Sequence, residues 1–178
     1  MRKYKENNNY KQPQNGITAE KMDTLDKIDI EILRHLQENG RLTTKELAQK
    51  VHLSTTPVNE RQKRLEREGY IQRYVAVIDA DKLNRGFTVC CSVKLHPLNK
   101  EIANNFCEKI KAIPEVVECY NISGKYDYMM KICAPDMKYY QQFVLNELGM
   151  IDCIGAIEST FVMDHIKYEI GIPLETKK

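Results

Sequence analysis

The 178-residue sequence lacks the features that usually reveal an enzyme or a membrane protein. No apolar stretch approaches the roughly 18 to 20 residues that a membrane-spanning helix needs, and residues 1–16 lack the apolar core of a secretory signal. The sequence also has no phosphate-binding glycine loop, no H-E-x-x-H motif and no recognisable pairing of a nucleophile with a base. We therefore expect a cytoplasmic protein that neither spans a membrane nor catalyses a reaction.

The six cysteines and four histidines lack the spacing of a metal site or a disulfide framework. No two cysteines form a C-x-x-C pair, and several lie within apolar, strand-like runs. Because a free cysteine behaves as a small hydrophobic residue, we interpret these thiols as core residues and expect no metal or other cofactor. The net charge of only +2 argues against a protein that coats nucleic acid nonspecifically.

Residues 43–64 predict two short helices joined by a tight turn, the pattern by which small domains place a helix in the major groove of DNA. Thr43 can cap the first helix, with Glu46 completing a capping box. The second helix should begin near Thr55 or Thr56, and either Ser54 or Thr56 can cap it.

A further helix precedes this pair and ends at Asn39-Gly40. After the pair, residues 70–78 are β-branched and aromatic, which predicts a β-ribbon. The whole pattern predicts a winged helix-turn-helix domain over residues 23–76. Residues 1–22 are rich in Asn, Lys and Gln with almost nothing to bury, so we expect a disordered tail.

The second helix of the pair has a buried side and an outward polar side when its residues are placed at 100° intervals. Short polar side chains near its start suit base edges, and basic side chains further along suit phosphates. Glu60 could accept from a cytosine amine or pair with an arginine, and Arg61 could instead tie the helix to its own domain. The residues expected at DNA are Ser54, Thr55, Thr56, Pro57, Asn59, Glu60, Arg61, Lys63, Arg64, Arg67 and Arg73.

Basic side chains dominate this part of the chain. Between residues 50 and 73 there are six basic residues against three glutamates. Charge alone would favour an ordinary solvated helix, but the paired helices and short turn favour DNA binding.

The second half of the chain, residues 88–172, has a strand, helix, strand, strand, helix, strand pattern. This order predicts a ferredoxin-like βαββαβ sandwich with both helices on one face of an antiparallel sheet, so the whole chain is of the α+β class. Residues 77–87 should form the linker and residues 173–178 a C-terminal tail. Because the other face of the sheet needs cover, we expect a homodimer.

The segment from Asn121 to Tyr128, NISGKYDY, contains a glycine turn beside an acidic side chain. It could hold a zwitterion, with backbone N–H groups binding the carboxylate and Asp127 binding the ammonium. The alternative is a simple hairpin turn in which Asp127 accepts from loop amides.

Two long blocks resemble the Lrp/AsnC family of regulators, particularly its leucine-responsive branch. LDKIDIEILRHLQENGRLTTKELAQKVHLSTTPVNERQKRLEREGYIQRYVAVID resembles the DNA-binding domain, and SGKYDYMMKICAPDM with STFVMDHIK resembles the effector-binding domain. The resemblance implies dimers that assemble into tetramers or octamers on double-stranded DNA, with a free amino acid bound between dimers. It implies effector-binding roles for Asn121, Gly124, Asp127, Met137, Thr160, Phe161 and Val162.

The function expected from these patterns is an amino-acid-responsive transcriptional regulator. Two alternative functions each differ from this one in a single feature. An amino-acid-metabolising enzyme would need a catalytic pair that the sequence does not show, and a nucleoid-organising protein would ignore small ligands. The sequence does not specify the amino acid, the promoters, or activation as against repression.

Overall fold

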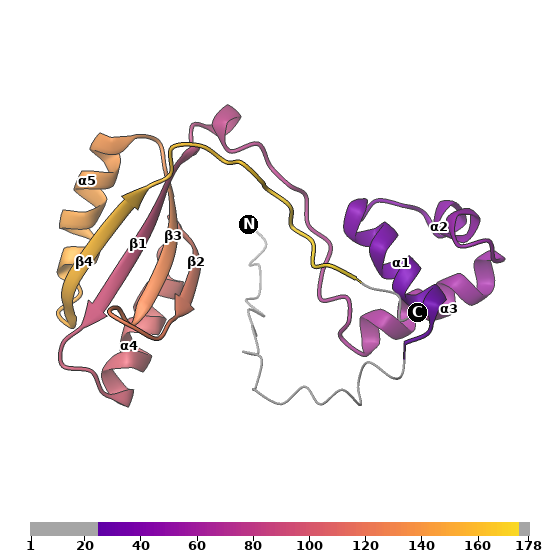
Figure 1. Cartoon of the computed structure of the whole chain (residues 1–178), viewed down its shortest axis with the longest axis horizontal. Helices are drawn as coiled ribbons and strands as arrows, with labels where there is room; N and C mark the ends of the chain where they lie inside the picture. The colour runs from indigo at the N-terminus through magenta and orange to yellow at the C-terminus, as the bar shows by residue number, and fades with distance from the viewer. Residues whose placement is uncertain (1–24, 175–178) are drawn as a thin grey trace, which may run out of the picture. The chain divides into compact units, whose positions relative to one another are not determined.

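A computed structural model describes residues 25–174 of the chain, so the expected tail of residues 1–22 lies outside the described residues. The described chain forms two compact units. The first comprises residues 25–76 together with 169–174, and the second comprises Val77–Tyr168. Figure 1 shows a group of helices in the first unit and a sheet covered by helices in the second.

The first unit contains α1 (Lys27–Glu38), α2 (Thr44–Lys50) and α3 (Thr55–Arg67). Its core consists of apolar side chains that recur at helical spacing on all three helices. These fully or almost fully buried residues include Ile32, Leu36, Leu47, Val58 and Leu65. Because Val58 and Leu65 face this core, the opposite side of α3 is left for solvent, as its sequence periodicity predicted.

Capping boxes begin two of the three helices. The Thr43 hydroxyl accepts from the backbone N–H of Glu46, and the Glu46 carboxylate accepts from the backbone N–H of Thr43, which confirms the predicted start of α2. Asp26 and Asp29 form the same reciprocal arrangement at α1. Ser54 occupies the N-cap of α3, but its side chain makes no capping bond.

The β-ribbon predicted for residues 70–78 is wrong, because this segment is extended but pairs with no other strand in the described chain. Tyr74 instead turns back onto α3, where its hydroxyl donates to Glu66 at 2.8 Å and accepts from the Gln62 amide at 3.0 Å. Strand propensity was therefore present without a pairing partner, and side-chain contacts with α3 hold the segment instead.

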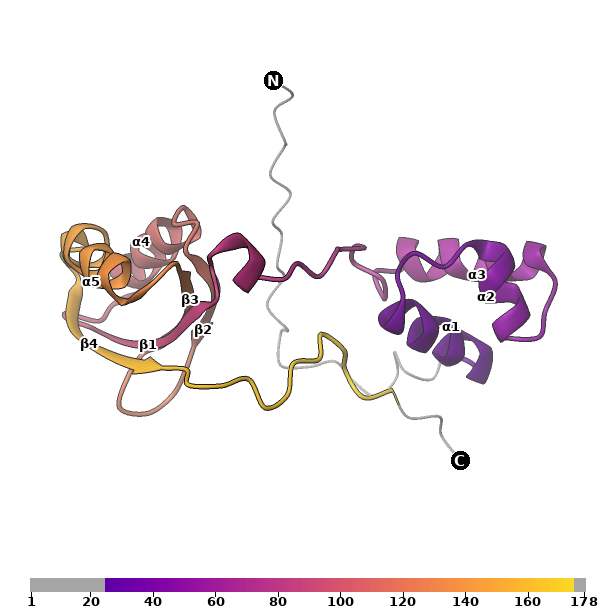
Figure 2. The same cartoon turned by 90° about the horizontal axis from the view of Figure 1, so that it is seen from above.

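The second unit contains the predicted βαββαβ order. Its elements are β1 (Phe87–Leu95), α4 (Lys100–Lys111), β2 (Val116–Asn121), β3 (Tyr128–Ala134), α5 (Met137–Asn146) and β4 (Ile154–Phe161). The strands form one antiparallel sheet in the order β2-β3-β1-β4. Figure 2 shows α4 and α5 on the same face of this sheet, which confirms the ferredoxin-like expectation.

The two faces of the sheet differ because side chains alternate along each strand. Val89, Cys91 and Val93 of β1 are fully buried under the helices. Their neighbours on the same strand point to the other face, where no helix of the unit lies. Tyr120 and Met129, which stand opposite each other on β2 and β3, remain exposed there.

The unit boundaries depart from the expected domain limits. Residues 77–87, expected as a linker, contain a 3-10 helix (Asp81–Leu83) and group with the second unit. Residues 169–172, expected in the second domain, group with the first.

All six cysteines are free thiols. Cys91 is buried, and this burial raises the pKa of its thiol to about 11. Cys119 is exposed on β2, so the core interpretation was wrong for that residue. Among residues 25–174, no three potential metal ligands cluster and no helix is long and apolar enough to cross a membrane.

Candidate DNA-binding and effector sites

The outward face of α3 carries most of the side chains expected to meet DNA. Ser54, Thr55, Thr56, Glu60, Lys63 and Arg67 are exposed, whereas Pro57 and Asn59 are partly buried. Lys63 and Arg67 make no ion pair with any residue in the described range, so both cations are available to phosphates. Arg73 is exposed in the segment that follows α3.

Two arginines of α3 are held by α1 instead. Arg61 donates from one terminal nitrogen to Asp26 at 2.6 Å and to Asp29 at 2.8 Å. Arg64 donates to the second carboxylate oxygen of Asp29 at 2.5 Å. The side chain of Asp29 is only 1% exposed, so its charge has little solvent and relies on these partners.

Arg61 thus forms the tie to its own domain that was one of its two expected roles, and Arg64 forms a similar tie that was not expected. Both guanidinium groups bind the Asp29 carboxylate inside the domain. A buried carboxylate without such partners is strongly destabilising, whereas a phosphate in solution is hydrated. The hydrogen bond to Asp29 is the main cause that raises the pKa of Arg61. Burial raises the pKa of Asp26, but bonds from Asp29 and Arg61 outweigh it and lower the net value.

Glu60 pairs with no arginine in the described chain, and its contact with a base stays a prediction. The acidic groups that do pair with α3 lie 32 or more positions earlier in the sequence. No local sequence pattern indicated that Asp26 and Asp29 would bind these arginines.

In the second unit, the glycine turn lies in the hairpin between β2 and β3. Gly124 has φ of +136°, a conformation that favours glycine. The backbone N–H groups of residues 123–126 make no hydrogen bond within the described chain, whereas Ile122 N–H donates to the Asp127 carbonyl at 2.9 Å. The turn thus presents several free donors.

The carboxylate of Asp127 already has partners within its own unit. It accepts from the Leu95 backbone N–H at 2.8 Å and from Lys94 Nζ at 3.0 Å. The Leu95 bond, followed by the Lys94 bond, holds the pKa of Asp127 below its usual value. Asn121 also stabilises the turn, since its side-chain amide donates to the Asp127 carbonyl at 3.0 Å. The carboxylate thus accepts from β1 and not from amides of its own loop, so the hairpin role and the ammonium contact of Asp127 both stay predictions.

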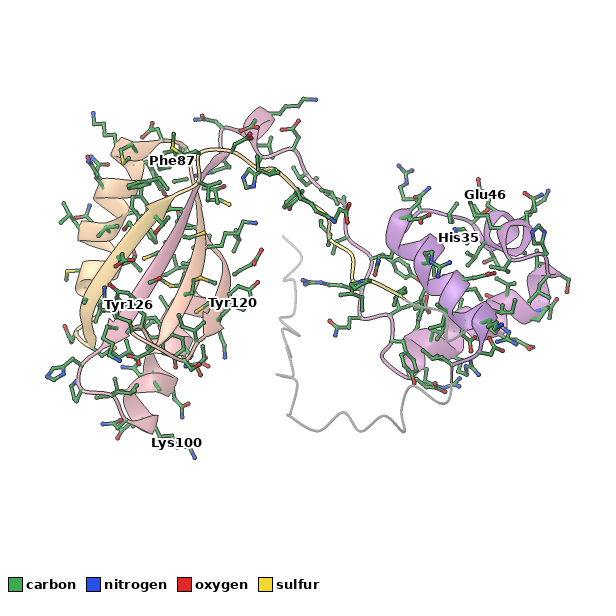
Figure 3. The ribbon with its side chains drawn as sticks, in the orientation of Figure 1. His35, Glu46, Phe87, Lys100, Tyr120 and Tyr126 are labelled. Carbon is green, nitrogen blue, oxygen red and sulfur yellow. The ribbon has the colours of Figure 1, made fainter. Side chains whose placement is uncertain are left out.

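The seven expected effector residues form two groups at opposite ends of the sheet. Phe161 stands opposite Val89 on β1, whereas the Asp127 N–H bonds the Val93 carbonyl four residues further along. At about 3.4 Å per residue, this separates the groups by about 14 Å, far more than the head group of an amino acid. Figure 3 shows Phe87 at one end of the sheet and Tyr126 at the other.

The first group comprises Asn121, Gly124 and Asp127, and the second comprises Met137, Thr160, Phe161 and Val162. Met137 is the first residue of α5, which follows β3 at the Phe87 end. Phe161 packs there between two aromatic rings, with its centroid 5.8 Å from those of Phe87 and Tyr140. A single copy of the chain therefore does not bring the two groups to one ligand.

The turn also carries interactions that sequence reasoning missed. The Tyr126 hydroxyl donates to Glu158 of β4 at 2.7 Å, and Lys125 Nζ donates to the same carboxylate at 3.4 Å. The Tyr126 bond, and then the Lys125 bond, lower the pKa of Glu158. No local sequence signal could reveal this contact, because Glu158 lies 32 residues from Tyr126.

A hollow of about 420 Å³ lies elsewhere on the unit, lined by the segment after Ala76, the open face of the sheet and residues that follow β4. Its lining includes Lys131, Cys133, His165 and Tyr168 but none of the expected effector residues. Its lining also includes Thr88, whose carbonyl accepts from Val162 N–H at 3.0 Å, so the hollow lies beside the second group.

Comparison with known proteins matches the two units separately. Residues 25–72 match the winged helix-turn-helix DNA-binding family, and residues 88–172 match the Lrp/AsnC ligand binding domain. The Bkd operon transcriptional regulator of Pseudomonas aeruginosa is 39% identical over 153 residues, which cover 86% of this chain and 100% of the relative. The leucine-responsive regulatory protein of Escherichia coli K12 is 32% identical over 153 residues, which cover 86% of this chain and 93% of the relative.

Solved structures agree. A transcriptional regulator of Neisseria meningitidis in complex with L-Met matches with a TM-score of 0.82 and 35% identity, covering 84% of this chain and 97% of the other. An AsnC family regulator of Agrobacterium tumefaciens matches with a TM-score of 0.81 and 39% identity over 84% of this chain and 97% of the other. With both units and their order matched, the chain belongs to the Lrp/AsnC family of DNA-binding transcriptional regulators, which are not enzymes.

Proposed function

We propose that this protein reads specific DNA sequences through α3 and changes its assembly and DNA binding in response to a free amino acid. The observation that carries this proposal is the pairing, in one chain, of exposed cations on α3 with an Lrp/AsnC ligand-binding domain. The L-Met complex of the Neisseria relative supports an amino acid as the class of ligand.

At DNA, the proposed division of roles follows the chemistry of the exposed side chains. Lys63 and Arg67 contact phosphates as unpaired cations, while Thr56, Asn59 and Glu60 near the start of α3 meet base edges. Arg61 and Arg64 position α3 rather than contact DNA, because Asp29 holds them.

For the effector, the separation of the two groups supports a site completed by more than one copy of the chain. The free N–H donors at residues 123–126 suit the ligand carboxylate. β4 is an edge strand, so part of its backbone carbonyls lack a partner in the same sheet and suit the ligand ammonium. Asp127 serves this site by holding the turn, and the Thr160 to Val162 end of β4 comes from another copy.

The open face of the sheet supports a homodimer as the basic unit. Tyr120 and Met129 are exposed there although both are large and apolar, and burial against an identical face would remove them from water. A site shared between dimers then links ligand binding to tetramers or octamers, because a ligand favours the assembly in which it makes most contacts.

Two measurements test this function. Thermal shift with each common free amino acid, followed by a turnover assay of any hit, should find a stabilising ligand that is not consumed. Selection from random DNA should return a defined motif, and Asn59→Ala should relax its preference at one position by about 1 to 3 kcal/mol. No stabilising amino acid together with a defined motif would favour the nucleoid-organising alternative, and consumption of the ligand would favour an enzyme.

A further inference from the structure

The last described part of the chain returns to the DNA-binding unit and bonds to α1. The side-chain amide of Gln37 donates to the Ile172 carbonyl at 2.9 Å, and its oxygen accepts from the Ile172 backbone N–H at 3.1 Å. Arg34, one turn earlier on α1, donates to the Leu174 carbonyl at 3.2 Å. The Gln37 side chain thus donates one hydrogen bond to the Ile172 backbone and accepts one from it, as the backbone of a paired strand would.

Glycine at position 171 permits this close approach. A Cβ atom built there would lie 2.4 Å from Gln37 Nε2 and 2.8 Å from Gln37 Cδ, which is shorter than any ordinary contact. The backbone of Gly171 does not have the positive φ that would itself require glycine. The absence of a side chain at position 171 therefore serves the contact with Gln37 rather than the local backbone.

Residues 162–168, which lead from β4 to this docked part of the chain, contact the effector unit. Val162 N–H, directly after β4, donates to the Thr88 carbonyl at 3.0 Å. Lys131 Nζ lies over the Tyr168 ring, 5.3 Å from the ring centroid. Only three residues separate Tyr168 from Ile172 in the chain.

Residues 162–174 lead from the expected effector residues at the end of β4 to α1. This helix is the one that binds arginines of α3. Thr160, Phe161 and Val162 stand at the end of β4, where this segment begins. At its far end, α1 is a continuous helix of 12 residues that also carries Asp29, the carboxylate that binds Arg61 and Arg64. The docked residues, α1 and the Asp29 ion pairs all belong to the first unit, and the docked residues follow Tyr168 of the second unit directly in the chain.

We propose that α1 presents a docking surface for residues 169–174 and that this docked segment transmits amino acid binding at β4 to the recognition helix. A ligand that shifts the end of β4 would shift residues 169–174 and the position of α1. The ion pairs of Asp29 would then shift α3 as well. The inference rests on the proposed function, since it assumes that the amino acid contacts the end of β4.

Two substitutions break the docked contact from opposite sides. Gly171→Ala places a methyl group where the Gln37 amide lies, so the amide must move and lose both bonds to Ile172. Gln37→Ala removes the same two bonds without altering the segment. Gln141→Ala is the matched control, because Gln141 is an exposed glutamine on α5 in the other unit.

The rate of hydrogen exchange at the Ile172 backbone amide of the full chain measures whether residues 169–174 are docked on α1. Loss of the bond to Gln37 should speed this exchange about tenfold in both variants and leave it unchanged in the control. Equal exchange rates in wild type and both variants would overturn the docking surface.

Transmission is read from the dissociation constant for a selected DNA fragment, measured with and without amino acid, starting with L-methionine and continuing through the common amino acids. Wild type should show a change of about fivefold or more. Both variants should show less than about a twofold change, while their affinity for the amino acid itself stays as in wild type.

The two possible failures are distinct. A wild-type change that persists unaltered in both variants would overturn the transmitting segment and leave the proposed function intact. A wild-type protein whose DNA affinity ignores every amino acid would overturn the proposed function and this inference with it.

Discussion

Asp29 of α1 and Arg64 of α3 form an ion pair of 2.5 Å in which the carboxylate is 1% exposed. Arg61 approaches the same carboxylate from the neighbouring turn of α3 at 2.8 Å. Two contacts one turn apart fix the rotation of α3 about its own axis as well as its position. That rotation decides which side chains of the recognition helix point outward.

Replacing Asp29 with Asn should destabilise the DNA-binding unit. The substitution removes the charge, leaving Arg64 without its carboxylate partner and Arg61 with Asp26 alone, a loss of about 3 kcal/mol in the free energy of unfolding. Urea titration of the full chain, followed by a probe in each unit, measures the change. Glu31→Gln, a charge removal on the same helix outside the clamp, is the control and should have little effect.

Replacing Lys63 or Arg67 with Ala should weaken DNA binding about equally for all sequences. Each contact with a phosphate releases a counterion, so each loss should reduce the slope of log affinity against log salt by about one. Fluorescence anisotropy over a range of salt concentrations measures both quantities. Lys138→Ala on α5 has the same charge change and should leave the slope as in wild type; a similar decrease there would point to a general charge effect.

Replacing Asp127 with Asn should destabilise the effector unit by about 1.5 to 3 kcal/mol at neutral pH, because the charged acceptor for Leu95 N–H and Lys94 is lost. In wild type the pKa of Asp127 is lower in the folded state than its usual value of 3.8. Its stabilisation is therefore complete above pH 3.8 and is lost as the pH falls through the lower folded pKa.

The difference in stability between wild type and Asp127→Asn should accordingly be constant near neutral pH and shrink below pH 3.8. Urea titrations at a series of pH values measure it. A variant with wild-type stability but a selective loss of amino acid affinity would instead show that Asp127 contacts the ligand ammonium directly.

Replacing Met129 with Lys should convert the proposed dimer into monomers. The substitution places a charge in the centre of the open sheet face, opposite Tyr120, where burial against a second copy would desolvate it. Analytical ultracentrifugation measures the mass. Leu145→Lys, at a 72% exposed position on α5, is the control and should keep the wild-type mass. A dimeric Met129→Lys would place the interface elsewhere.

Sequence patterns with a local physical cause predicted the fold well. The Thr43 and Glu46 spacing located the start of α2, and the strand and helix order in the second half gave the ferredoxin-like topology. The winged helix-turn-helix class was predicted correctly, but strand propensity at residues 70–78 supplies no partner for its hydrogen bonds within the described chain.

The sites were harder to predict because their decisive contacts are distant in sequence. Arg64 and Asp29 are 35 residues apart, so a basic residue on α3 could not be assigned to the protein rather than to DNA. The separation of Gly124 from Phe161 depends on strand register, which the sequence pattern did not specify.

The central claim is that DNA binding by the first unit and amino acid binding by the second are linked. Linkage requires that DNA change the affinity for the amino acid by the same factor as the amino acid changes the affinity for DNA. The most direct test is calorimetric titration of the amino acid into the full chain, alone and saturated with a selected DNA fragment. We predict dissociation constants that differ by about fivefold or more. Identical constants with and without DNA would contradict the account.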